Sequence, residues 1–133
     1  MTDTLDTHAP KAIAALRIMA GLLFLAHGTQ KLLGFPAAQF EAPLLSLFGA
    51  AGIIEIATGT LIVLGLFTRP AAFLASGTMA AAYFLAHAPQ GFFPANNGGD
   101  AAILFCFVFL ALVFTGPGAA ALDNRSRTRA AYA

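Results

Sequence analysis

The chain has 133 residues, of which 59% are hydrophobic and only 10% charged, with a formal net charge of +1 and a mean hydropathy of +0.79. Soluble domains typically carry about a quarter of their residues as charged side chains, so this chain has too few charges to cover a soluble surface. The composition excludes an ordinary soluble domain. No nucleic acid partner is expected, since no basic stretch lies outside the C-terminal tail. The single cysteine, Cys106, excludes an intramolecular disulfide and is interpreted as a packing residue.

Four apolar stretches follow one another along the chain, and each approaches the roughly 20 residues that a helix needs to cross a bilayer. Proline, glycine and asparagine residues separate them, as is typical of helix ends and turns. The predicted fold is an all-α membrane protein, a four-transmembrane-helix bundle. Its expected parts are an N-terminal segment (1–11), a membrane domain (12–118, with spans at about 12–33, 44–67, 71–88 and 101–115) and a basic tail (119–133).

The basic residues predict the orientation of this bundle. With four spans, one side carries all but one of them, and the opposite side carries only Lys31. Because cytoplasmic loops are enriched in Lys and Arg, both termini are expected in the cytoplasm, with the tail either lying on anionic headgroups or disordered. The basic residues assigned to the cytoplasmic side are Lys11, Arg17, Arg69, Arg125, Arg127 and Arg129.

The first span carries an unusual polar stripe. Arg17, Gly21, Gly28 and Lys31 recur at helical spacing, with His27 beside them. Such a stripe is expected to face the bundle, where the glycines permit close helix approach. The alternative is that Arg17 and Lys31 merely extend to opposite membrane surfaces.

Glu55 lies in the middle of the second predicted span, on one face with Gly52 and Gly59. An ionised carboxylate at this depth is costly unless it is paired or faces water. One interpretation is a buried ion pair with Arg17 that fixes helix packing. The other is a proton-linked or ligand-binding carboxylate, with His27 as a neighbour.

Two short segments of the chain resemble each other, and both are predicted to end at the outer membrane face. The segment Phe24–Gln30 resembles Phe84–Gln90, and both segments contain histidine and glutamine at matching places. This pattern indicates either an internal duplication or a coincidence. In either case the predicted topology brings His27 and His87 to the same outer surface.

The candidate site is a polar seam made of seven side chains. Glu55, His27 and His87 are the candidates for chemistry. A quinone fits such a seam, since it needs aromatic walls and a histidine or carboxylate that exchanges protons with its carbonyls. Haem ligation by the two histidines and a zinc site are weaker alternatives, and no metal is expected. The polar seam comprises Arg17, His27, Lys31, Glu55, Tyr83, His87 and Asp100.

The order of these residues along the chain resembles the DoxX family of small four-helix bacterial inner-membrane proteins. The motifs cover nearly the whole chain, and the one departure noted is Asp100 where such proteins often carry Glu. The matching residues are Leu16, Arg17, Gly21, Phe24, His27, Gly28, Lys31, Gly34-Phe35, Glu55, Gly59, the run from Leu64 to Arg69, Met79, the His87 region, Gly98-Gly99-Asp100, Gly116-Pro117-Gly118 and Leu122-Asp123.

The resemblance implies a multi-pass protein of the bacterial inner membrane that is linked to respiratory or redox chemistry. Similar proteins include subunits named for quinol oxidase and thiosulfate:quinone oxidoreductase systems, and organisers for superoxide- or thiol-handling partners. It supplies no catalytic residues. Three hypotheses follow: a quinone-binding oxidoreductase component, a non-catalytic membrane anchor or assembly partner, and a small proton-coupled transporter. The expected partners are the lipid bilayer and either further copies of the chain or other membrane or redox proteins.

Overall fold

The computed structural model describes residues 2–37 and 42–125, and every regular element in these two ranges is helical, as the composition predicts. Arg127 and Arg129 of the expected basic tail lie outside the described residues. The elements are α1 (Thr2–Leu33), α2 (Leu47–Leu64), α3 (Thr68–Ala82), the π-helix η1 (Tyr83–His87), the 3₁₀-helix η2 (Ala88–Gln90), α4 (Pro94–Asn97) and α5 (Asp100–Thr115).

Three helical segments are long and apolar enough to cross a membrane. They are Asp3–Leu33, Leu47–Leu64 and Thr68–Gln90, whereas the apolar helix Asp100–Thr115 is shorter. At ~1.5 Å per residue, α5 is about 24 Å long, somewhat less than the ~30 Å hydrocarbon core. The first helix begins at Thr2 and continues through Pro10, whereas the sequence predicts a membrane span that starts near Ala12.

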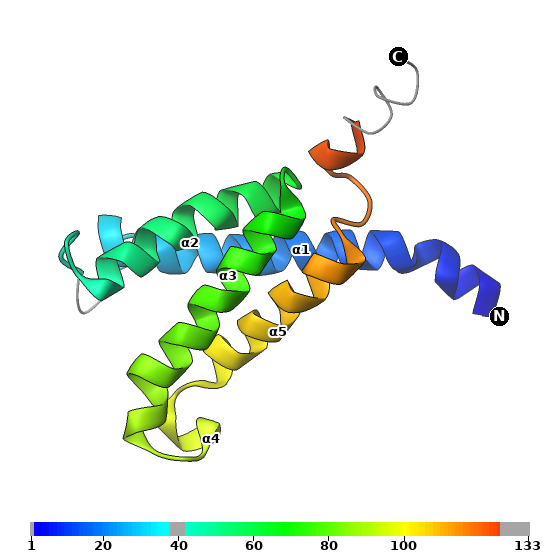
Figure 1. The fold of residues 1–133 in the computed structure, drawn as a ribbon. Coiled ribbons are helices and arrows are strands. Elements are labelled where there is room, and N and C mark those ends of the chain that lie inside the picture. Colours follow the sequence, from blue (N-terminus) through cyan, green and yellow to red (C-terminus); the bar gives the residue numbers. More distant parts are fainter. Residues whose placement is uncertain (1, 38–41, 126–133) are drawn as a thin grey trace.

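The long helices form two antiparallel pairs. In Figure 1, α1 lies beside α2, α3 lies beside α5, and the two pairs cross obliquely. The α2–α3 turn and the chain just after α5 lie toward the same end of the molecule as the N-terminal half of α1, whose first turns project beyond them (Figure 1). The short helix α4 and the turn before α5 lie at the other end of the second pair.

Glycines determine how closely α1 and α2 approach. A Cβ atom at Gly28 would lie 2.9 Å from the Gly52 carbonyl oxygen and from the Ile56 amide nitrogen. One at Gly59 would lie 3.0 Å from the Leu25 amide nitrogen. Since real Cβ atoms do not approach backbone atoms this closely, the α1–α2 pair depends on glycine at these positions. The glycine stripe therefore serves packing within this chain.

The apolar core lies where the two pairs cross. Phe24 of α1 is fully buried against Phe105 and Phe109 of α5, with ring centroids 5.7 and 4.8 Å away. Within the second pair, the Ser76 hydroxyl donates to the Cys106 carbonyl oxygen at 2.8 Å. Cys106 is a partly buried packing residue, as its apolar neighbours predict.

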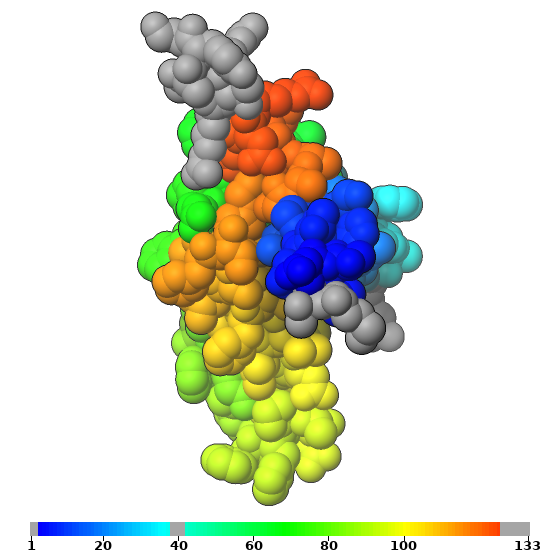
Figure 2. Space-filling view, turned by 90° about the vertical axis from the view of Figure 1, so that its right-hand side faces the viewer, coloured from blue at the N-terminus to red at the C-terminus, as the bar shows by residue number. Residues whose placement is uncertain are grey.

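The segment after α5 folds back onto the other elements at its end of the molecule. Figure 2 shows the first part of α1 (blue) against this orange segment, and the Ala119 amide donates to the Pro10 carbonyl oxygen at 2.8 Å. The Asp123 carboxylate accepts from the amides of Phe67 and Thr68 at 2.8 and 2.9 Å. Because these amides begin α3 and have no partner within the helix, Asp123 caps that helix from a distant part of the chain.

Candidate functional site

Arg17 does not pair with Glu55, contrary to one of the two interpretations of the sequence. Its side chain is completely buried, and its guanidinium donates to five backbone carbonyl oxygens. Two belong to the last turn of α2 and three to the segment after α5. The negative end of the α2 dipole favours a cation here, and the carbonyls replace the water that a buried guanidinium loses. The acceptors are the carbonyl oxygens of Ile62, Val63, Pro117, Ala119 and Ala120.

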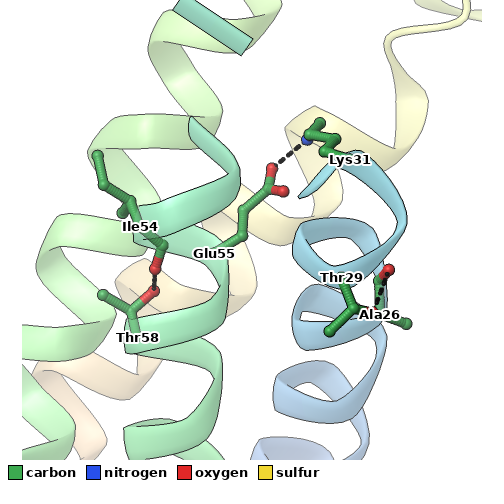
Figure 3. Close-up of polar contacts among 6 residues, drawn as sticks. All are labelled: Ala26, Thr29, Lys31, Ile54, Glu55 and Thr58. Atoms are coloured by element: carbon green, nitrogen blue, oxygen red, sulfur yellow. Dashed lines mark hydrogen bonds and ion pairs between the residues drawn. The ribbon is translucent and has the colours of Figure 1, made fainter. Parts of the chain in front are cut away.

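Glu55 pairs instead with Lys31. The Lys31 ammonium lies 2.5 Å from Glu55 Oε1, and the two side chains are 28% and 1% exposed. Figure 3 shows Lys31 reaching from the end of α1 toward the carboxylate on α2. The alternative that Lys31 extends away to the membrane surface is therefore wrong.

The register of the α1–α2 pair explains this choice of partner. Gly21 packs against Val63, Gly59 against Leu25, and Gly28 against Ile56. In this antiparallel register Glu55 is level with the turn before Lys31, whereas Arg17 lies roughly 18 Å further along the helix. A long side chain bridges the first separation and cannot bridge the second.

One carboxylate oxygen of Glu55 has no hydrogen-bond partner in the part of the chain that the structure describes. Oε2 is buried and lacks a hydrogen bond to any of the described residues. Buried polar atoms in native proteins are nearly always satisfied, so an unpartnered carboxylate oxygen indicates a ligand or an ordered water. This side chain lines a cavity.

The Glu55 pocket is a cavity of about 300 Å³ between the two helix pairs. Its lining comes from α1, α2, α3, η1, Gly98 in the turn before α5, and α5. Its lining is apolar and aromatic, with four ionisable side chains among it, which is typical of sites for small organic ligands. The lining residues are Phe24, His27, Lys31, Phe48, Ala51, Glu55, Met79, Ala82, Ala86, His87, Gly98, Ala101, Ala102 and Phe105.

A π-helical turn presents His87 to the pocket. Helix α3 widens at Tyr83 into η1, a deviation that occurs frequently at functional sites. His87 Nδ1 lies 3.1 Å from the Asn97 carbonyl oxygen. A carbonyl only accepts, so Nδ1 donates, and Nε2 is the acceptor of the neutral ring.

Asn97 and Tyr83 hold this histidine in place. The Asn97 side chain is buried, donates to the Gly91 carbonyl oxygen at 2.8 Å and accepts from the Gly99 amide at 2.8 Å. The Tyr83 ring stacks on His87, with centroids 6.5 Å apart. Tyr83, a predicted member of the polar seam, therefore lies behind the histidine and does not line the pocket.

The structure brings together only part of the predicted polar seam. His27, Lys31, Glu55 and His87 line one cavity, and the His27 ring is edge-on to Phe105 at 5.9 Å. Arg17 lies near the middle of α1 and does not line the pocket. Asp100, at the start of α5, is exposed and does not line the pocket.

Several lining residues are absent from the predicted site. Two of them, Phe48 and Ala51, share a face of α2 with Glu55 by their three-then-four spacing. This spacing is the sequence signal that would have identified them as pocket residues. Ala82 and Ala86 give no chemical signal in a sequence. Among the described residues, no group of three or more His, Cys, Asp or Glu is arranged to hold a metal ion.

Comparison of the sequence with known protein families identifies the family of this chain. The family model described as DoxX matches residues 12–88, which include the stripe of α1, Glu55 and His87. The chain belongs to the DoxX family. The resemblance predicted from the order of residues is thereby confirmed.

Three curated relatives of the DoxX chain support the same assignment. An uncharacterised protein of Haemophilus influenzae is 45% identical over 92% of this chain and 96% of its own length. An uncharacterised membrane protein of Mycobacterium tuberculosis is 32% identical, over 95% and 88% of the two chains. The inner membrane protein YphA of Escherichia coli is 33% identical, over 87% and 91%. No solved structure gives a significant match.

These findings agree with the apolar helices. The chain is a multi-pass helical protein of the bacterial inner membrane. Two of these relatives are named for a membrane location, and none of the three names states an activity, so the function is argued from the Glu55 pocket.

Proposed function

We propose that this DoxX protein binds the headgroup of a quinone in the Glu55 pocket and acts as a membrane subunit of a redox system. The observation that carries the proposal is Glu55 Oε2, a buried carboxylate oxygen that lies at the wall of a cavity and has no partner within residues 2–37 and 42–125. Its other oxygen is held by Lys31. The carboxylate is therefore fixed in position while half of its hydrogen-bonding capacity is left for a ligand.

The charge state of Glu55 selects the kind of group that binds. Paired with the Lys31 ammonium, the carboxylate is an acceptor only, so the ligand must offer a hydrogen-bond donor. A quinol hydroxyl is such a donor. The Lys31 ammonium has further donors for a carbonyl oxygen of the oxidised form.

The remaining walls suit an aromatic ring. Phe24, Phe48 and Phe105 line the same cavity, and His27 and His87 are further groups for proton exchange. The neutral His87 ring has Nε2 as its acceptor, since Nδ1 is engaged by the Asn97 carbonyl oxygen. In this proposal Glu55 and His87 exchange protons with the ligand's oxygens, and a partner redox protein exchanges electrons with the bound ring.

The same proposal includes the full topology. We infer that α5 is the fourth span and that both termini are cytoplasmic, which puts the Glu55 pocket toward the outer half of the membrane. The distribution of Lys and Arg supports this orientation. So does the position of the α2–α3 turn and the segment after α5, which lie toward the same end of the molecule as the N-terminal half of α1 (Figure 1).

The quinone content of the purified protein tests the proposal. Glu55→Gln keeps the shape of the side chain but removes the charged acceptor, so we expect the bound quinone per protein to fall at least tenfold. Asp100→Asn is the matched control, because Asp100 is an exposed carboxylate outside the pocket. Its quinone content is expected to equal that of the wild type.

The outcome also separates this proposal from the anchor hypothesis. If Glu55→Gln folds normally and retains its quinone, the pocket is not a quinone site. A wild-type protein that carries no quinone from native membranes, but co-purifies with other proteins, would favour a non-catalytic anchor.

A further inference from the structure

A second cavity lies on the other side of the helices that wall the Glu55 pocket. It has a volume of about 240 Å³ and lies between α2 and the α3–η1 segment. We call it the α2–α3 groove. Its lining residues are Leu47, Phe48, Ala50, Ala51, Ile54, Thr78, Ala81, Ala82, Leu85 and Ala86.

The lining of the α2–α3 groove is apolar throughout. It contains no charged side chain, and its one hydroxyl, on Thr78, already donates to the Leu74 carbonyl oxygen at 2.8 Å. Leu47 and Leu85 on its rim are 65% and 60% exposed. On a membrane protein such a rim faces lipid chains, so the groove offers nothing to a polar ligand.

The groove and the Glu55 pocket share a wall. Phe48, Ala51, Ala82 and Ala86 line both cavities. Three of these four side chains are single methyl groups, so the wall between the lipid-facing groove and the pocket that holds the Glu55 carboxylate consists mostly of small side chains. The two cavities are therefore neighbours across a wall that consists mostly of alanines.

We propose that the ligand of the Glu55 pocket is a long-chain amphiphile that enters sideways from the bilayer, with its apolar chain lying in the α2–α3 groove. The inference rests on the proposed function and adds the class of ligand and its route. The polar head reaches Glu55 Oε2 and Lys31, and the chain passes over Ala51, Ala82 and Ala86.

The dimensions of the groove fit this role. From Leu47 to Ile54 it follows α2 for roughly 10 Å at ~1.5 Å per residue. This length holds the first part of an apolar chain and leaves the remainder in lipid. The apolar chain of a ligand that is already in the bilayer gains little free energy when it leaves lipid for the groove. The groove therefore contributes little affinity; it selects chains by shape and provides a path from the membrane.

Two substitutions fill the groove without touching the Glu55 pocket. Ala50 and Ala81 are exposed and line the groove alone, so Ala50→Phe and Ala81→Phe should obstruct the chain. Ala57→Phe is the matched control, because Ala57 is an exposed alanine of α2 that lines neither cavity. All three positions accept a larger apolar side chain facing lipid.

The experiment measures binding of two benzoquinols to protein in lipid nanodiscs. One probe carries a long saturated chain and the other has none. The ratio of their affinities is compared between variants, because partition of each probe into the bilayer is the same in every variant and cancels. We expect Ala50→Phe and Ala81→Phe to weaken the long-chain probe at least tenfold, with the chainless probe unchanged. Ala57→Phe should change neither.

The outcomes separate this inference from the proposed function. If the groove variants leave the long-chain probe unaffected while Glu55→Gln weakens both probes, the chain of the bound ligand does not lie in the α2–α3 groove and the inference is wrong. In that case the groove holds only ordinary lipid chains. If neither probe binds the wild type, both the proposed function and the inference fail.

Discussion

Arg17 and Lys31 lie on one helical stripe and look equivalent in the sequence, yet their side chains have different structural roles. Arg17 is buried at the end of α2, where its planar guanidinium reaches acceptors on two segments. The Asp123 carboxylate adds a favourable electrostatic interaction. Lys31 is partly exposed and holds one carboxylate oxygen at the pocket wall. The first residue joins elements together, and the second prepares the candidate site.

Removing the Arg17 guanidinium should destabilise the fold. Arg17→Met removes five charge-assisted hydrogen bonds to backbone carbonyl oxygens, at a cost on the order of 3 kcal/mol in the free energy of unfolding. Arg69→Met is the matched control, because Arg69 also donates to carbonyl oxygens, those of Val113 and Phe114, but is exposed. Unfolding in detergent should show a large loss for Arg17→Met and a small one for Arg69→Met. Equal losses would contradict the role assigned to burial.

At the scale of elements, the α1–α2 pair fixes the candidate site and the second pair completes it. Gly28 and Gly59 bring the helices close enough that their register is defined by backbone contacts. That register sets Glu55 level with the end of α1. The π-helical turn of η1 then adds His87 from the second pair.

Two glycine substitutions separate close packing from helix propensity. Gly28→Ala should destabilise the protein by about 1–3 kcal/mol, since its Cβ would collide with backbone atoms of α2. Gly77→Ala is the control, because nothing lies within 4 Å of a Cβ at Gly77. It should be neutral or stabilise α3 by about 0.5–1 kcal/mol. Thermal unfolding of both variants in one detergent measures the difference. A loss of similar size in Gly77→Ala would show that packing is not the cause.

At the scale of the whole molecule, the two ends differ in composition and in structure. One end is closed by the segment after α5, which binds Arg17 and caps α3 through Asp123. The other end holds the Glu55 pocket and exposed aromatic residues such as Phe92, which is 86% exposed. The closed end is the one proposed to face the cytoplasm.

Labelling of single cysteines with an impermeant thiol reagent tests this topology. In a Cys106→Ala background, Leu45→Cys and Phe92→Cys should be labelled from outside intact inner-membrane spheroplasts. Thr4→Cys and Arg125→Cys should react only after permeabilisation. All four positions are exposed, so the reagent can reach each of them on its own side. Labelling of both Phe92→Cys and Arg125→Cys from outside would show that α5, which lies between them, does not complete a fourth span.

The sequence by itself determined the membrane setting, the all-helical class and the DoxX family, because hydropathy and the order of motifs are properties of the chain. It also placed α5 closely, at 101–115 against Asp100–Thr115, since Gly99 and Gly116 punctuate an unbroken apolar run. It correctly singled out Glu55 as a buried carboxylate.

Only the tertiary structure decided which groups meet. The spacing along α1 puts Arg17 and Lys31 on one face, but which of them reaches Glu55 depends on the register of α2 against α1. That register is set by close backbone contacts at Gly28 and Gly59, which hydropathy does not encode. The acceptors of Arg17 on the segment after α5 are a hundred or more residues away along the chain, so no local pattern predicts them.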